Sequence, residues 1–151
     1  MRKIILFVVC FTVLAGFLGS AFGEFAKPED AIELRKSAMT LIAYQFKKIA
    51  AVIKGEQPYD SAGFVADTEA FKMLSDLSWD AFIVPESDKG HTTLNAKALK
   101  DPKAFKAEAE ELMTAASHLV KAAKSGDLKA AKAPFGEAAK SCKDCHKKYR
   151  K

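Results

Sequence analysis

Hydrophobic residues recur along most of the chain at spacings of three and four, the period of one face of an α-helix. The pattern predicts four helices, over roughly residues 28–54, 64–77, 102–125 and 128–151. Past residue 23, no stretch sustains the alternation of apolar and polar residues that marks a half-buried strand. The expected fold class is therefore all-α, a four-helix bundle. Its expected core positions are Met39, Ile42, Phe46, Ile49 and Ile53; Phe64, Thr68, Phe71, Leu74 and Leu77; Phe105, Ala109, Leu112, Ala116, Leu119 and Ala123; and Phe135, Ala138, Cys142, Cys145 and Tyr149.

Proline, glycine and aspartate residues place the helix ends. Pro28 and Pro102 stand where the first and third helices should begin, since proline fits the first turn. Gly126 ends the third helix, and Asp127 is a suitable N-cap for the fourth. Pro134 departs from an ideal helix, because it removes one backbone hydrogen bond, so we expect it to kink or loosen that turn.

Two connections separate the helices, one short and one long. Residues 58–63 are expected to form a turn, and residues 78–101 form a connection of unusual length for a small domain. Trp79 and Phe82 lie at the beginning of the long connection. These aromatic residues predict that its first part is ordered and packs against the core.

The first residues of the chain have the pattern of a secretory signal peptide. Arg2 and Lys3 precede an apolar run over residues 4–18, and small residues follow up to Gly23. The run is shorter than the roughly 20 residues that a transmembrane helix needs. We therefore expect a cleaved signal peptide over residues 1–23, a mature domain over residues 24–151 in the periplasm, and no membrane anchor after cleavage.

Charge and composition exclude several functions. Without Arg2 and Lys3 the basic residues fall from 24 to 22 against 19 acidic ones, a net charge of +3. No basic patch interleaved with aromatic residues accompanies this small excess, so a nucleic-acid partner is not expected. Neither paired carboxylates for acid–base catalysis nor a nucleophile motif is present, and we do not expect an enzyme. Asp and Glu residues are expected on solvated outer helix faces.

The chemistry is concentrated near the end of the chain, where Cys142, Cys145 and His146 form the sequence C-x-x-C-H. This spacing is the attachment signature of c-type haem. On a helix, residues three and four apart share a face, so both thiols can reach the haem from one side. His146 then lies one step further round, where its imidazole can bind the iron. Both cysteines also occupy predicted core positions, so one covalently bound haem c is the expected cofactor.

Other uses of two cysteines fit less well. A structural zinc site needs about four ligands, and the mature chain adds only His91 and His118 to the motif. A thioredoxin-like pair usually follows a strand and opens a helix, whereas this pair closes one. A disulfide across so short a loop would be strained and would leave His146 without a role.

Small residues at predicted core positions of the third and fourth helices have two interpretations. Ala109, Ala116, Ala123 and Ala138 could leave a gap between helices that a flat haem fills. They could equally allow the helices to pack closely. The sequence alone leaves both open.

The mature sequence resembles the cytochrome c′ family, the class II c-type cytochromes, over its whole length. The most specific matches lie at residues 27–32, at Leu77-Ser78-Trp79, at Asp88-Lys89-Gly90, at residues 124–128 and at the haem motif followed by Tyr149-Arg150. The resemblance implies an antiparallel four-helix bundle, often a homodimer, with haem attached near the C-terminus. It also implies covalent attachment through Cys142 and Cys145, with His146 as the axial iron ligand.

The resemblance implies further contacts with the haem. Arg35 matches a family arginine that contacts a haem propionate, and Lys36 stands where many members have Gln. The loop around His91 matches the segment that covers a haem edge, and Arg150 matches a basic residue close to the axial histidine. Met39 occupies the position on the distal side of the iron.

Two functions follow, depending on Met39. If Met39 does not bind the iron, the resemblance implies a five-coordinate, high-spin haem that binds small diatomic gases such as nitric oxide and carbon monoxide. If the Met39 sulfur is the sixth ligand, the protein is a low-spin electron-transfer cytochrome, since Met/His ligation raises the potential. A periplasmic redox partner protein is expected in either case. Retention of Arg35 and the match at residues 27–32 favour the gas-binding form.

Overall fold

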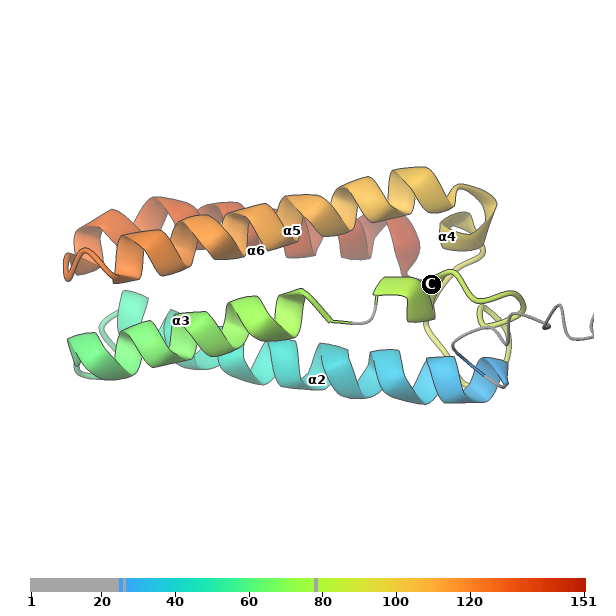
Figure 1. Cartoon of the computed structure of the whole chain (residues 1–151), viewed down its shortest axis with the longest axis horizontal. Helices are drawn as coiled ribbons and strands as arrows, with labels where there is room; N and C mark the ends of the chain where they lie inside the picture. Colours follow the sequence, from blue (N-terminus) through green and yellow to red (C-terminus); the bar gives the residue numbers. More distant parts are fainter. Residues whose placement is uncertain (1–24, 26, 78) are drawn as a thin grey trace, which may run out of the picture.

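The computed structural model describes residue 25, residues 27–77 and residues 79–151, so the predicted signal peptide lies outside the described residues. Four long helices make up most of this part: α2 (Pro28–Ile53), α3 (Ser61–Ser75), α5 (Pro102–Ala123) and α6 (Leu128–Tyr149). Figure 1 shows them side by side, with α5 and α6 above α2 and α3 and with consecutive long helices running in opposite directions. The predicted fold class, an all-α antiparallel four-helix bundle, is confirmed.

Aspartate caps fix the beginnings of three helices. The side chains of Asp60, Asp101 and Asp127 each accept a hydrogen bond from a backbone N–H in the first turn of α3, α5 and α6, at 2.8, 3.0 and 2.9 Å. The predicted cap at Asp127 is confirmed. Because Asp60 caps it, α3 begins at Ser61, inside the segment predicted as a turn. Pro134 lies inside α6, and the helix continues through it without a break.

The end of α3 corrects one core prediction. The helix ends at Ser75 with Asp76 as its C-cap, so the helical period stops before Leu77. Leu77 is 46% exposed rather than buried, and Ser75 is fully buried in its place. The Ser75 hydroxyl donates a hydrogen bond to the carbonyl of Phe71 at 2.8 Å, and this bond makes burial of a polar side chain tolerable.

The long connection is ordered and closes one end of the bundle. It contains a 3₁₀ turn, η2 (Trp79–Phe82), and a short helix, α4 (Lys97–Lys100). The rings of Trp79 and Phe82 lie 5.5 Å apart, and that of Phe82 lies 5.2 Å from the ring of Phe105 on α5. Leu94 also forms an isolated antiparallel β-bridge with Arg150 at the end of the chain. The prediction that the first part of this connection packs against the core is confirmed.

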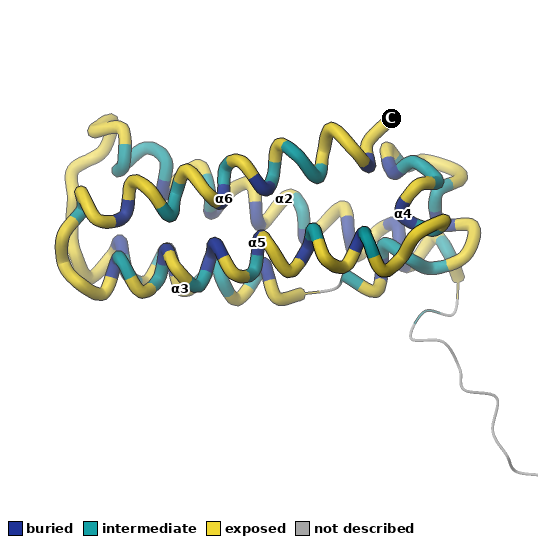
Figure 2. Tube along the Cα trace, turned by 90° about the horizontal axis from the view of Figure 1, so that it is seen from above, coloured by how far each residue is buried: buried dark blue, intermediate teal, exposed yellow. Residues whose placement is uncertain are grey.

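The core runs along the bundle axis, and Figure 2 shows the buried positions of each long helix turned toward the other helices. Ala116, Ala123 and Ala138 belong to this core, and all are almost fully buried. The contact between α5 and α6 is the most extensive between any two described elements. Close packing is therefore the interpretation that holds for these alanines. Among the described residues, no helix has the length and apolar character needed to cross a membrane.

Candidate functional site

A cavity of about 780 Å³ opens between α2 and α6, toward the end of the bundle that the long connection closes. Ligand and cofactor sites commonly have volumes of about 300 to 1,000 Å³ and mostly apolar walls. The apolar part of this wall includes residues of α2, η2 and α5, namely Met39, Ile42, Phe46, Trp79, Phe82, Phe105 and Leu112. The cavity is therefore large enough, and apolar enough, for a planar cofactor such as haem.

Both motif cysteines lie on this wall. Cys142 and Cys145 are free thiols, partly buried, on the same face of α6. Burial raises the pKa of the Cys142 thiol. Burial, reinforced by the negative charge of Glu108, raises the pKa of Cys145 to about 11. Both thiols are thus protonated at neutral pH and are turned toward the cavity.

The third member of the motif, His146, lies on the same wall. His146 is exposed as a residue, but partial loss of solvation against the cavity wall, together with the positive charge of Arg150, lowers its pKa. The lowered pKa favours the neutral imidazole, which is the form that binds a metal ion. Haem c needs two thiols for its covalent attachment and one neutral imidazole to bind its iron. All three lie on one wall of an apolar cavity, so these residues fit the group.

Met39 reaches the cavity from α2, the helix across from the cysteines. Its side chain is half-buried and packs against the core cluster that includes Ile42 and Leu112. The structure therefore places Met39 and His146 on the same cavity from two different helices.

Arg35 also lines the cavity, but its guanidinium is bonded to the long connection. It donates hydrogen bonds to the carbonyl of Ala81 at 3.1 Å, to the hydroxyl of Ser87 at 2.9 Å and to the hydroxyl of Thr92 at 2.7 Å, and it also bonds the carbonyl of Ser87. The side chain lies over the ring of Phe82, 5.8 Å from its centroid. Burial lowers the pKa of Arg35, and the negative charge of Asp88 opposes this effect. Arg35 therefore holds the loop over one end of the cavity.

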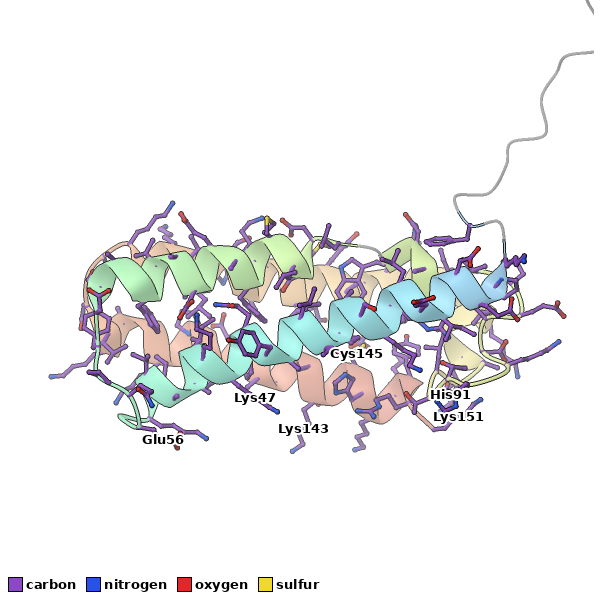
Figure 3. The ribbon with its side chains drawn as sticks, turned by 90° about the horizontal axis from the view of Figure 1, so that it is seen from below. Lys47, Glu56, His91, Lys143, Cys145 and Lys151 are labelled. Carbon is purple, nitrogen blue, oxygen red and sulfur yellow. The ribbon has the colours of Figure 1, made fainter. Side chains whose placement is uncertain are left out.

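The two remaining residues predicted to contact the haem, Lys36 and His91, differ in whether they line the cavity. Lys36 lines the cavity and is exposed. His91 is exposed and is not among the residues that line it, whereas Thr92 and Thr93 are. Figure 3 shows His91 beside Lys151 on the outside of this end of the molecule. The segment around His91 thus reaches the cavity through the two threonines that follow it.

The general expectation that Asp and Glu residues lie on solvated outer helix faces does not hold for Glu108. It lines the cavity and accepts a hydrogen bond from Lys148 at 2.9 Å, with its side chain only 21% exposed. The spacing Phe105, Glu108, Leu112 is three and four, so the helical period could have identified it. Its charge lies close enough to Cys145 to affect that thiol.

Tyr149 is a second residue that received no functional role from the sequence. Its ring lines the cavity and packs edge-on against that of Phe105, 5.0 Å between centroids. Tyr149 is 3% exposed, and its hydroxyl has no hydrogen-bond partner among the described residues. The aromatic character of Tyr149, rather than its hydroxyl, is what the observed packing uses.

Comparisons with known proteins agree with this site. A family model described as Cytochrome C' matches residues 30–150. Cytochrome c' from Alcaligenes xylosoxydans xylosoxydans is 41% identical over 128 residues, which cover 85% of this chain and 98% of the relative. A similar match, 41% over 128 residues, covers 84% of this chain and 98% of cytochrome c' from Rubrivivax gelatinosus.

Solved structures are similar over the same part of the chain. Cytochrome c prime from Shewanella frigidimarina aligns with a TM-score of 0.81 at 38% identity, covering 85% of this chain and 99% of that one. Two variants of the Alcaligenes xylosoxidans protein, one a nitric oxide complex and one with carbon monoxide bound, align with TM-scores of 0.78 at 41% identity. They cover 85% of this chain and 98% and 99% of their own. The chain therefore belongs to the cytochrome c′ family, and its cofactor is covalently bound haem c.

Proposed function

We propose that this protein is a periplasmic mono-haem cytochrome that binds nitric oxide or carbon monoxide at a five-coordinate, high-spin haem. The observation that carries the proposal is the apolar wall around Met39, on the cavity that the cysteine motif also lines. When bound, haem c supplies an iron that can take a diatomic ligand and can change its oxidation state. The proposed role is binding rather than catalysis, so the protein is not an enzyme.

The C-terminal motif holds the cofactor in this proposal. Cys142 and Cys145 would hold the haem through two thioether bonds, and the imidazole of His146 would bind the iron. The half-buried thiols and the lowered pKa of His146 support these assignments, since a neutral imidazole is available without loss of a proton. Arg150 lies near enough to act on the charge of His146, and it would bias the imidazole toward the neutral form.

Met39 selects what reaches the distal side of the iron. Met39, Ile42 and Phe46 offer no hydrogen bond to an incoming molecule, so water and charged ligands gain nothing to offset their loss of solvation. A small neutral gas carries almost no such penalty and needs only enough space. The nitric oxide and carbon monoxide complexes of the Alcaligenes xylosoxidans variants support the same ligand class for this chain.

The alternative function is electron transfer by a low-spin haem with Met39 as the sixth ligand. The observation that favours it is the position of Met39 and His146 on one cavity, from two helices. A thioether held by a rigid helix could remain on the iron in both oxidation states, as an electron carrier requires. A periplasmic redox partner protein is part of this function and is compatible with the first.

Absorption and resonance Raman spectra of the purified haem protein separate the two functions. The proposal predicts a high-spin ferric spectrum and no sulfur-to-iron vibration. A six-coordinate, low-spin ferric spectrum with that vibration would replace gas binding by the Met39-ligated carrier. The Met39→Leu variant is the control, because leucine keeps the apolar wall but cannot bind iron.

Polar residues at the loop end of the cavity are proposed to hold the haem propionates. Lys36 is exposed on the cavity edge and can pair with a carboxylate. Arg35 has most of its donors bonded to the long connection, so a propionate would share this guanidinium with the loop. We propose that the segment of His91 covers the haem edge through Thr92 and Thr93.

Export and dimerisation complete the proposal. Residues 1–23 would direct the chain to the periplasm. N-terminal sequencing of the mature protein should then begin near Glu24.

Exposed apolar side chains on α2 and at the end of α3 support a homodimer: Leu34, Leu41, Met73 and Leu77 are 39%, 52%, 62% and 46% exposed. Analytical ultracentrifugation of the wild type and of Leu41→Glu tests it, since a buried charge at the contact should give monomers.

A further inference from the structure

The mouth of the cavity is bordered by basic side chains on both helices. Lys36, Lys47 and Arg150 are exposed residues of the cavity lining. Lys143 lies one turn before His146 on α6, and Lys151 follows Arg150. Figure 3 shows Lys47 and Lys143 pointing to the same side of the molecule, from α2 and α6 respectively. We call these five residues, Lys36, Lys47, Lys143, Arg150 and Lys151, the basic rim.

The side chains of the basic rim are free of ion pairs with acidic side chains among the described residues. Within the part of the chain that the structure describes, none of its five side chains forms an ion pair with a carboxylate. Glu108 on the cavity wall is paired with Lys148 at 2.9 Å, and Asp144 beside Lys143 is paired with Lys140 at 2.7 Å. Asp88 lies near Lys151, whose ammonium donates to the Asp88 backbone carbonyl at 2.8 Å. The two carboxylates that a bound haem c brings would be fewer than the five cations, so a positive excess would remain at the mouth.

An exposed aromatic residue lies inside the basic rim. On α2, Lys36, Thr40, Tyr44 and Lys47 form one stripe at spacings of four, four and three, and all four line the cavity. Tyr44 is 63% exposed, so the bundle core does not account for it. Protein–protein interfaces are enriched in such aromatic residues, surrounded by a polar rim.

We propose that the cavity mouth is the docking surface for an acidic redox protein, whose carboxylates pair with the basic rim around a contact on Tyr44. This inference rests on the proposed function, since it identifies the chemistry of the redox partner. Complementary charge raises the rate of encounter more than it raises affinity, by about 10- to 1,000-fold at low salt. The position of the basic rim would bring the partner to the opening nearest the cofactor.

Charge reversal on the haem-loaded protein tests the proposal. The probe is a photoreduced, acidic flavodoxin, and the measured quantity is its second-order rate of haem reduction at low and high ionic strength. The Lys47→Glu, Lys143→Glu double variant should lower the rate at low salt about tenfold or more. Raising the salt should remove most of the difference, because the Debye length falls to about 3 Å at 1 M.

The matched control moves the same charge elsewhere. Lys121 is exposed on α5, is not part of the cavity lining and forms no ion pair among the described residues. Lys121→Glu together with Lys132→Glu, also exposed, changes the net charge equally and should leave the rate within about twofold. An equal fall in both double variants would overturn the proposal, because net charge alone would then explain the rate.

Two further measurements keep the outcomes distinct. Neutral hydroxymethylferrocene should react equally fast with all variants, because it carries no charge. If no reagent exchanges electrons with the haem protein, the redox function is refuted. Flavodoxin binding measured by NMR would then test docking alone. Duplex DNA and anionic phosphatidylglycerol vesicles serve as competing polyanions. Binding to either as tight as to flavodoxin, with the same dependence on Lys47 and Lys143, would overturn the assignment to a protein.

Discussion

Arg35 on α2 is bonded to both oxygens of Ser87, a residue 52 positions later in the long connection. Its guanidinium donates to the Ser87 hydroxyl at 2.9 Å and also to the Ser87 carbonyl, and Ser87 itself is fully buried. A buried carbonyl without a partner costs free energy, so this arginine satisfies a group that the loop cannot satisfy alone. The loop that closes the cavity is thus held by one side chain of the facing helix.

Replacing Arg35 with leucine should loosen the loop and destabilise the protein. The carbonyls of Ala81 and Ser87 would lose their donor, and we expect a loss of roughly 2 to 4 kcal/mol in the free energy of unfolding. Denaturant unfolding gives this value, and hydrogen exchange of residues 83–93 reports the loop directly. Lys36→Leu removes the same charge from an exposed neighbour and should cost no more than about 0.5 kcal/mol. Equal effects of the two substitutions would contradict the clamp and indicate a general effect of charge.

Covalent attachment predicts a graded response to the loss of the motif cysteines. The Cys142→Ser, Cys145→Ser double variant should carry no covalent haem, and either single variant should retain one thioether. Haem staining of a denaturing gel and the pyridine haemochrome spectrum measure the two outcomes. Ser141→Ala is the control, since Ser141 is a buried neighbour on the same cavity. Covalent haem in the double variant would refute attachment through these thiols.

Met39→Ala should raise the affinity for carbon monoxide if Met39 only fills space over the iron. Removing a steric cost of about 1.4 kcal/mol corresponds to about a tenfold gain. Met39→Leu keeps a side chain of similar size, so its affinity should remain close to that of the wild type. If Met39 were instead the sixth ligand, both variants would gain affinity and both would become high-spin. Carbon monoxide titration followed by absorption therefore separates the two roles with one pair of variants.

The sequence was sufficient to predict the features that depend on residues close together in the chain, namely the long helices and one helix cap. The three-and-four spacing identified all four long helices, and the aspartate at residue 127 identified a cap, because these signals lie within a turn or two of each other. The C-x-x-C-H motif lay in phase with the core of its helix for the same reason. Leu77 was misplaced because the period cannot show where a helix stops, and α3 ends two residues before it.

Contacts between distant segments could not be predicted. The acceptors of Arg35 lie 46 to 57 positions away, in a loop without regular period, so nothing near Arg35 indicates them. The position of the cavity depends on how far α2 and α6 separate, and this distance is set by the packing of all four helices. Glu108 differs, because its spacing from Phe105 and Leu112 already placed it on the inner face.

The raised pKa of Cys145 predicts slow alkylation of the chain before haem is attached. A thiolate reacts and a thiol does not, so a pKa of about 11 leaves little reactive form at pH 8. Iodoacetamide should therefore modify Cys145, followed in the Cys142→Ser variant, roughly 100-fold more slowly in the native chain at pH 8 than in guanidinium, where the pKa is about 8.5. The difference should shrink as the pH rises toward 11. Equal rates at pH 8 would show that the thiols are not buried in the haem-free chain.

Pro134 in α6 offers a test of stability that leaves the haem motif unchanged. Proline cannot donate to the carbonyl four residues earlier, and α6 nevertheless continues through it, so Pro134→Ala should restore one bond and stabilise the protein by about 1 to 3 kcal/mol. Gly136→Ala is the matched comparison in the same helix, where an added Cβ meets no atom within 4 Å, and its gain should be smaller, about 0.5 to 1 kcal/mol. Thermal unfolding of the two variants gives the order. The ring of Phe135, the residue after Pro134, stacks on that of Phe46 with 4.6 Å between centroids. A lower melting temperature for Pro134→Ala would therefore mean that the proline positions Phe135, and that this packing outweighs the missing hydrogen bond.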